Sequence, residues 1–340
     1  MFPVQLPPKE GGATAARALP VEERRFPVQL PPKEGGATAA RALPVGELWF
    51  PVWADVDHVL HRGAASHPEC PERVEAIMVS LPAKVELRLL RDPLPEEVRS
   101  AVLGKGKGWS MTRDADTYKT AATPLLLERG RGLLEAAVDT LLSGETKSGF
   151  VLIRPPGHHA GPWGLPSGFC HQNNLWHCAE RFYASGWKNI ALLDWDVHHG
   201  DGTEAIVTLK GASHPGIRFC SIHAFGSGIY PGTGAASRSD TILNLPLPRG
   251  CGPRSYLREF RMEALPYLLE KGKPDVILVS AGYDAHKDDP MGYMRLEDDT
   301  YAAMSEDLKG IGCPVLFVLE GGYNTAALGR CVAATIQPWL

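Results

Sequence analysis

The sequence lacks the features that mark several classes of protein. It has no run of about 20 apolar residues, the length that a helix needs to cross a bilayer. Its seven cysteines are odd in number, widely spaced and without a C-x-x-C pair, so we expect a reducing compartment and no disulfide framework. The net charge of -4 is spread over mixed signs. Without a basic stripe, direct binding to nucleic acids or membranes is not expected.

The N-terminal segment also lacks the charged-then-apolar pattern of a secretory signal. We therefore predict an intracellular protein of the cytoplasm or nucleus, with organelle targeting left open. Residues 2–21 recur without change at residues 26–45, in copies rich in Pro, Gly and Ala that offer little to bury. Residues 1–47 are predicted to be a flexible, repeat-containing tail and residues 48–340 a single domain. An error in the gene sequence would produce the same duplication.

From Trp49 onward, short apolar runs alternate with longer segments of helical character. The five clearest runs are residues 150–153, 190–193, 217–222, 276–279 and 315–319. Each is continuous enough for a strand buried on both faces. Helical segments include residues 132–142, 254–271 and 298–309. The alternation predicts an α/β fold with a mostly parallel sheet covered by helices.

Polar residues follow each of these five runs directly. The five tails read RPPGHHA, DWDVHHGDGT, HAFGSGIYPGTG, SAGYDAHKDDP and EGGYN. Because the carboxyl ends of parallel strands line one crevice, these His, Asp and Gly residues are expected to converge. Their convergence predicts the functional site.

The densest tail contains candidate metal ligands. In an extended segment Asp194, Asp196 and His198 share one face, and Asp284 at the end of another strand can supply a further ligand. Carboxylates with an imidazole suit a divalent transition metal, and three protein ligands leave a position open for water, as in catalytic zinc sites. A turn or cap would explain a single D-x-H. Several buried carboxylates, however, need a compensating cation.

Other residues of the tails suit proton transfer. The adjacent His158 and His159 follow a strand, and Asp194 and Asp201 are available as their carboxylate partners if they bind no metal. Gly321 and Gly322 let the chain bend so that Tyr323 can face inward and stabilise an oxyanion. Packing of Tyr323 over a turn is an equally ordinary explanation.

With these residues assembled, the sequence resembles the histone deacetylase and acetylpolyamine amidohydrolase family, of arginase-like α/β fold, and looks most similar to its class II branch. The resemblance covers roughly residues 50–340. The matching motifs occur in order and are RPPGHHA, GFCHQNN, LLDWDVHHGDGT, HAFGSGIYPGTG, SAGYDAHKDDP and LEGGYN. HPECPERVEAI, at residues 67–77, resembles the N-terminal motif of the family.

The resemblance implies a role for each matched residue. The ligands of one Zn²⁺ ion would be Asp196, His198 and Asp284. His159 would act as general base and then acid, with Asp201 behind it, and His158 would be its electrostatic partner, with Asp194 behind it. Tyr323 would donate a hydrogen bond to the substrate carbonyl.

The resemblance also implies a narrow acyl-lysine channel. Its walls would be Phe169 and Phe225, bordered by Gly168, with Met291 at the rim. A monovalent cation, usually potassium, would bind beside the zinc strand. Its ligands would come from Asp194, Asp196, His198, Ser221 and Ile222.

Two residues narrow the function. A ureohydrolase of this fold needs two manganese ions and an Asp at position 282, where this chain has Gly282, so one metal ion is expected. A polyamine-preferring enzyme would carry an acidic residue at the rim, where this chain has Met291. Acetyl-lysine in a histone or another protein is therefore the favoured substrate. Acetylpolyamines, other small acylated amines and other acyl groups remain alternatives.

One segment favours a different class of function. Between Pro95 and Tyr118 the chain is shorter than the family pattern, without a clear counterpart of its His-containing motif or its rim aspartate. This leaves an acetyl-lysine-binding scaffold with weak activity as the alternative. The complete set of metal ligands and proton-transfer residues favours a metal-dependent amidohydrolase.

Overall fold

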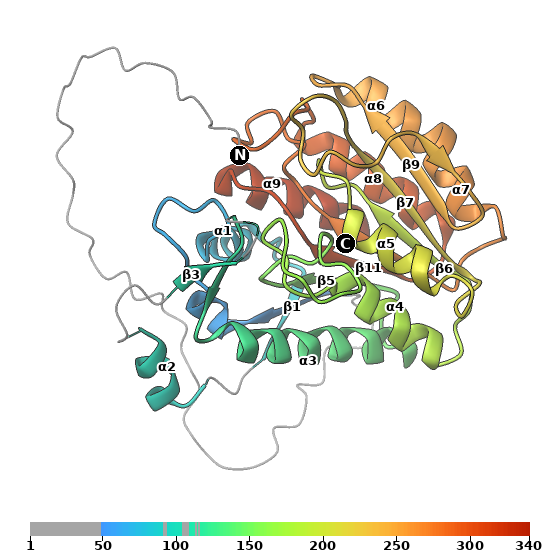
Figure 1. Cartoon of the computed structure of the whole chain (residues 1–340). Coiled ribbons are helices and arrows are strands. Elements are labelled where there is room, and N and C mark those ends of the chain that lie inside the picture. The colour runs from blue at the N-terminus through green and yellow to red at the C-terminus, as the bar shows by residue number, and fades with distance from the viewer. Residues whose placement is uncertain (1–48, 91–93, 104–108, 113, 115) are drawn as a thin grey trace. The chain divides into compact units, whose positions relative to one another are not determined.

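The computed structural model describes residues 49–90, 94–103, 109–112, 114 and 116–340 (Figure 1). The predicted tail over residues 1–47 lies outside this part of the chain. No helix within these ranges is long and apolar enough to cross a membrane.

The described residues form a nine-stranded sheet in the order β2-β1-β5-β11-β10-β6-β7-β9-β8. Its strands are β1 (Phe50–Asp55), β2 (Val85–Leu90), β5 (Ser148–Leu152), β6 (Ile190–Asp194), β7 (Ile217–Ala224), β8 (Ser237–Arg238), β9 (Ile242–Leu247), β10 (Val276–Ala281) and β11 (Val315–Leu319). Neighbouring strands are parallel except β8 and β9. A separate antiparallel hairpin pairs β3 (Trp109–Met111) with β4 (Tyr118–Thr120).

Helices cover both faces of this sheet (Figure 1). One apolar cluster joins the sheet to α3 (Thr123–Leu142), α4 (Asn174–Ala184) and α5 (Asp201–Lys210). The other joins it to α1 (Glu72–Ser80), α6 (Pro253–Glu259), α7 (Leu265–Leu269), α8 (Asp298–Ile311) and α9 (Thr325–Ile336). The remaining helices are α2 (Glu96–Leu103), the 3₁₀ turns η1 (Val56–Leu60) and η3 (Gln337–Trp339), and the π-helical turn η2 (Phe260–Ala264).

Strand β6 shows why the apolar runs are continuous. Ile190 and Leu192 belong to the cluster on one face, whereas Ala191 and Leu193 belong to the cluster on the other. Because successive side chains of a strand point to opposite faces, a strand covered on both sides needs apolar residues at every position. The α/β fold predicted from these runs is confirmed.

The five predicted strands correspond to β5, β6, β7, β10 and β11, which are five adjacent strands of the sheet. Parallel neighbours end at the same edge, so their polar tails do meet. The predicted helix over residues 254–271 corresponds to a segment that is helical from Pro253 to Leu269, in which the π-helical turn η2 lies between α6 and α7. Pro266 lies at the start of α7, where its missing N–H prevents one hydrogen bond of a continuous helix.

Candidate active site

The ends of β6 and β10 bring three candidate ligands together. Atoms of Asp196, His198 and Asp284 that can bind a metal all lie within 4.8 Å of one another, and all three residues are buried. Main-chain N–H groups orient both carboxylates. Asp196 Oδ1 accepts from the His198 N–H at 2.9 Å, and Asp284 Oδ1 accepts from the Val197 N–H at 2.9 Å. The predicted set is therefore preorganised by the turn that follows β6.

The charge of this cluster fits a bound cation. Asp284 Oδ2 is buried and lies 3.1 Å from His198 Nδ1, but it accepts no hydrogen bond of good geometry from the described residues. Burial and the neighbouring Asp196 raise the pKa of Asp284 to about 7. Burial opposes protonation of His198, yet the carboxylates of Asp284 and Asp196 raise its pKa to about 10. The cluster thus has an excess of negative charge, and a divalent metal is the ordinary way to neutralise it.

Two glycines set the space around these carboxylates. A Cβ atom on Gly282 would collide with the carboxylate of Asp196, and one on Gly321 would collide with both Asp196 and Asp284. The Gly321 N–H also donates to Asp196 Oδ2 at 2.8 Å. A side chain at position 282, where a second metal would need a ligand, has no room unless Asp196 moves.

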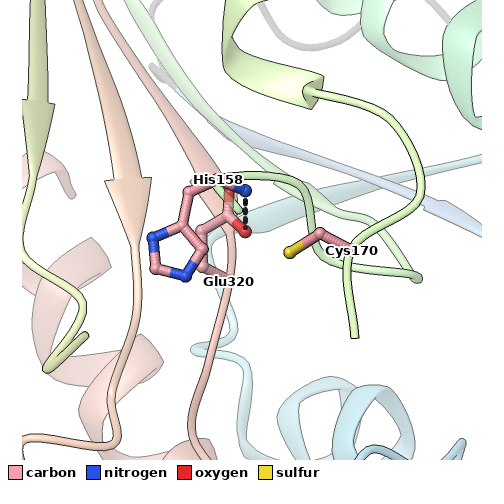
Figure 2. Close-up of side chains that lie close together, drawn as sticks. All are labelled: His158, Cys170 and Glu320. Atoms are coloured by element: carbon pink, nitrogen blue, oxygen red, sulfur yellow. Dashed lines mark hydrogen bonds between the residues drawn. The ribbon is translucent and has the colours of Figure 1, made fainter. Parts of the chain in front are cut away.

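The described residues contain two further groups with potential ligand atoms. His158, Cys170 and Glu320 form the first (Figure 2). Glu320 Oε2 accepts hydrogen bonds from the main-chain N–H groups of Gly157 at 2.6 Å and His158 at 3.1 Å. Burial raises the pKa of the Cys170 thiol well above its usual range, so the thiolate that a metal prefers is disfavoured. This group holds the turn at His158 in place.

His286, Asp298 and Cys331 form the second group. Here Asp298 accepts a hydrogen bond from Arg330 Nε at 2.7 Å and lies 3.0 Å from His286 Nε2. The guanidinium already supplies the positive charge that a metal would bring. The Asp196 cluster is therefore the better metal site of the three.

Both predicted His–Asp pairs are present. His158 Nδ1 lies 3.0 Å from Asp194 Oδ2, and His159 Nδ1 lies 2.6 Å from Asp201 Oδ1. Burial and then His158 lower the pKa of His159 to about 4. Burial opposes protonation of His158, but Asp196 and Asp194 raise its pKa well above the usual value. The pKa values of the two adjacent imidazoles are therefore shifted in opposite directions.

Tyr230, an aromatic residue that was not predicted, lies against His159, and the place of Phe225 as a channel wall stays a prediction. The ring of Tyr230 meets His159 edge to face with centroids 4.9 Å apart, and its hydroxyl lies 2.7 Å from Ser167 Oγ. Phe225 donates its main-chain N–H to the Leu247 carbonyl, and 38% of the residue is exposed. Both aromatics occur in the segment that follows β7.

The predicted Phe169 does lie beside Tyr323. Their rings meet edge to face with centroids 5.7 Å apart. Burial, and then the charge of Asp284, raise the pKa of Tyr323 well above its usual range. Its phenol therefore keeps the proton that a hydrogen-bond donor needs. Gly168 adopts φ +51°, and a Cβ atom there would collide with the His159 ring.

Asp114 lies beside Gly168, in the segment where the sequence showed no clear counterpart of a rim aspartate. Its Oδ2 accepts the Gly168 N–H at 3.0 Å, and its Oδ1 accepts the Thr117 N–H at 2.9 Å. The sequence alone did not reveal the role of this residue, because its position depends on the β3–β4 hairpin within the shortened segment of residues 95–118. The DADT sequence in that hairpin was the available signal.

Met291 belongs to the same loop as Asp284. Asp289 Oδ1 accepts the Met291 N–H at 2.9 Å, and Asp289 Oδ2 accepts the Tyr323 N–H at 2.6 Å. This carboxylate ties the loop to the segment that carries Tyr323. Met291 is half-buried, and its place at a substrate rim stays a prediction.

The residues expected around a monovalent cation lie on neighbouring strands. Asp194 of β6 is paired in register with Ser221 of β7, and its Oδ1 accepts the Asp196 N–H at 3.0 Å. The Ile222 carbonyl accepts from Tyr256 at 3.4 Å. Potassium binding at this place stays a prediction.

The fold and the site together define an α/β enzyme with a candidate metal centre and two His–Asp pairs at the carboxyl edge of its sheet. A family profile described as the histone deacetylase domain matches residues 92–338. The chain belongs to the histone deacetylase family and is a hydrolase of acyl amides.

Relatives come from bacteria and plants. An uncharacterized protein of Synechocystis is 37% identical over 306 residues, with 82% of this chain and 96% of the relative covered. Histone deacetylase 14, chloroplastic, of Arabidopsis thaliana is 35% identical, with 84% and 75% covered. Acetylpolyamine amidohydrolase of Mycoplana ramosa is 33% identical, with 64% and 65% covered. The crystal structure of the HDA15 HD domain superposes with a TM-score of 0.73 at 30% identity, covering 84% of this chain and 90% of that one.

Proposed function

We propose that the protein deacetylates acetyl-lysine in proteins or peptides and depends on one zinc ion. The observation that carries the proposal is the buried Asp196, His198 and Asp284 cluster with its excess negative charge. The two His–Asp pairs beside it support a hydrolytic role. A protein that only bound acetyl-lysine would have no use for paired proton-transfer groups.

The proposed mechanism uses the geometry of His159. Asp196, His198 and Asp284 would hold the zinc ion, which when bound supplies a Lewis acid for the amide carbonyl and for water. Because Asp201 accepts the Nδ1 proton of His159, the Nε2 atom is left to take a proton from the attacking water. The imidazolium then gives this proton to the leaving amine.

Two further groups complete the mechanism. Tyr323 donates a hydrogen bond to the carbonyl oxygen as that oxygen gains negative charge. Phe169 and an aromatic ring of the segment after β7, Phe225 or Tyr230, contact the methylene groups of the lysine side chain. Gly168 permits this arrangement, because any larger residue there would collide with His159.

A substrate panel tests this function. The zinc-loaded protein is expected to hydrolyse a fluorogenic acetyl-lysine peptide, to lose activity with a chelator and to regain it with added zinc. Turnover of acetylpolyamines alone would instead identify a small-amine amidohydrolase, in line with the relative from Mycoplana ramosa. If neither substrate class is cleaved, the enzyme proposal is wrong and the acetyl-lysine-binding scaffold is favoured.

Tyr323→Phe separates chemistry from metal binding. Loss of one oxyanion donor is expected to lower kcat by about 10²- to 10³-fold with unchanged zinc content. Tyr183→Phe, which removes a hydroxyl from α4, is the matched control and should keep wild-type kcat. Loss of zinc in proportion to activity in Tyr323→Phe would mean that Tyr323 supports the metal site and does not act in catalysis.

A further inference from the structure

A wide groove opens beside His159. Its volume is about 810 Å³, and residues from three segments line it. These are the β3–β4 hairpin, the loop of residues 160–167 and the first turn of α5. His159 and Asp201 are both among its lining residues. The groove is therefore continuous with the candidate active site.

Large apolar side chains stand exposed in this groove. Trp163 is 75% exposed and Leu165 is 60% exposed, and Met111 of the β3–β4 hairpin is 40% exposed. Single exposed apolar residues are common, but several that line one concave surface indicate a binding site. A tryptophan offers a large contact area with few rotatable bonds, so it can bind a partner at a small entropic cost.

The loop that carries Trp163 and Leu165 is fixed at both ends. The Ala160 N–H donates to the Gly157 carbonyl at 3.0 Å, and Ser167 and Cys170 exchange two main-chain hydrogen bonds at 2.8 and 3.0 Å. Pro162 and Pro166 limit its backbone freedom further. The apolar surface is thus held in place before a substrate arrives.

The position of the groove determines what can occupy it. Because His159 and Asp201 belong to both the groove and the candidate site, a substrate whose acyl amide lies at His159 can extend along the groove. A small acetylated amine carries no apolar side chain that could fill the groove. A peptide does, because residues near the acylated lysine leave the site with the chain. Asp114 and Lys119 also line the groove, and their polar groups can form hydrogen bonds with the main chain of a peptide.

We propose that Trp163, Leu165 and Met111 bind a large apolar side chain of a peptide or protein substrate, close in sequence to the acylated lysine. This inference rests on the proposed deacetylase function and narrows its substrate class. It predicts that the protein discriminates among acetyl-lysine sites by a flanking leucine or aromatic residue.

Two sets of acetyl-lysine peptides test the proposal with the full chain. One set carries an apolar residue, Leu or Phe, at one of the three positions on either side of the lysine. The other set carries Ser at the same position and is otherwise identical. For at least one position, wild-type kcat/KM is expected to be about tenfold or more higher for the apolar peptide than for the serine peptide. In Trp163→Ser and Leu165→Ser this ratio should fall toward one.

Met262→Ser is the matched control. Met262 is 66% exposed in the π-helical turn η2, outside the groove, and its variant should keep the wild-type ratio. Circular dichroism and zinc content verify the fold of each variant.

Four results overturn the proposal. Equal kcat/KM for apolar and serine peptides in the wild type refutes it and leaves the deacetylase function intact. An unchanged ratio in both groove variants does the same. A rise in turnover of all peptides in Trp163→Ser would show that another part of this chain occupies the groove. If no acetyl-lysine peptide is cleaved at all, the proposed function fails and this inference fails with it.

Discussion

Two buried clusters of charged side chains differ in how their charges are compensated. One is the Asp196 cluster, and the other is the Glu69 cluster, which consists of Glu69, Arg73 and Arg154. The Glu69 carboxylate accepts hydrogen bonds from Arg154 Nη2 at 2.8 Å and from Arg73 Nη1 at 3.3 Å. Asp196 and Asp284 have imidazoles as their only ion-pair partners among the described residues. A structural cluster contains its own cations, whereas the candidate active site leaves negative charge for a cation from solution.

The two clusters are connected through one segment. Arg73 donates from Nε to the Gly322 carbonyl at 2.6 Å and from NH2 to the Glu320 carbonyl. The Glu320 side chain in turn holds the main chain of His158. The Glu69 cluster therefore supports the strand end from which Tyr323 and the His158 turn are positioned.

Asp284→Asn is the strongest test of this difference. It removes one of the two carboxylates that share the His198 imidazole as an ion-pair partner, so zinc content is expected to fall to near zero and activity by more than about 10³-fold. The metal-free fold should be retained, because two close carboxylates repel each other. Elemental analysis and a thermal melt measure both. Asp288→Asn, in the same loop and 53% exposed, should keep both zinc and activity.

Glu69→Gln is the opposite case. It leaves the guanidinium of Arg154 buried without a carboxylate, and the free energy of unfolding should fall by about 3–5 kcal/mol. Zinc content of the folded fraction should not change. Denaturant unfolding measures the effect. A loss below about 1 kcal/mol would contradict the view that this pair is a structural element.

The same residue predicts a pH dependence. Burial opposes ionisation of Glu69, but Arg154 holds its pKa well below the usual range. A lowered pKa in the folded state stabilises the protein above the unfolded pKa of about 4.3, and this contribution is lost as the pH falls. Wild-type stability should therefore decline below that pH more steeply than that of Glu69→Gln. Parallel melts of the two proteins between neutral and acidic pH compare the slopes.

Glu320→Ala tests the connection between the clusters. Two buried N–H groups lose their acceptor, so kcat should fall by about 10- to 100-fold while KM changes little. Glu320→Gln keeps an amide oxygen and should restore most of kcat. Equal losses in both variants would show that the charge of Glu320, and not its hydrogen bonds, is what matters.

The sequence predicted the five adjacent strands and the residues at their ends. The apolar runs of β5, β6, β7, β10 and β11 are buried on both faces, and such strands leave a continuous signal. Strand β2 left no such signal in the sequence, because its residues are all half-buried and include Glu86 and Arg88. The helix that contains Pro266 was predicted, but its π-helical turn was not, since the apolar periodicity continues through that turn.

Residues that act through long-range contacts were harder to predict. Asp114 reaches the site by a hydrogen bond to Gly168, 54 positions away in the chain, and Glu320 reaches His158 across 162 positions. Tyr230 and Phe225 lie five residues apart in one irregular tail, where no period fixes the direction of a side chain. Only the fold brings such groups together.

The smallest expected effect comes from an ion pair in solvent. Arg181 NH2 of α4 lies 2.7 Å from Asp139 Oδ1 of α3, but both side chains are about half exposed, at 42% and 57%. Water screens such a pair, so Asp139→Asn should cost less than about 1 kcal/mol and leave activity unchanged. A double-mutant cycle with Arg181→Gln measures the coupling directly. A coupling as large as the loss in Glu69→Gln would show that burial is not what separates structural from superficial charges in this fold.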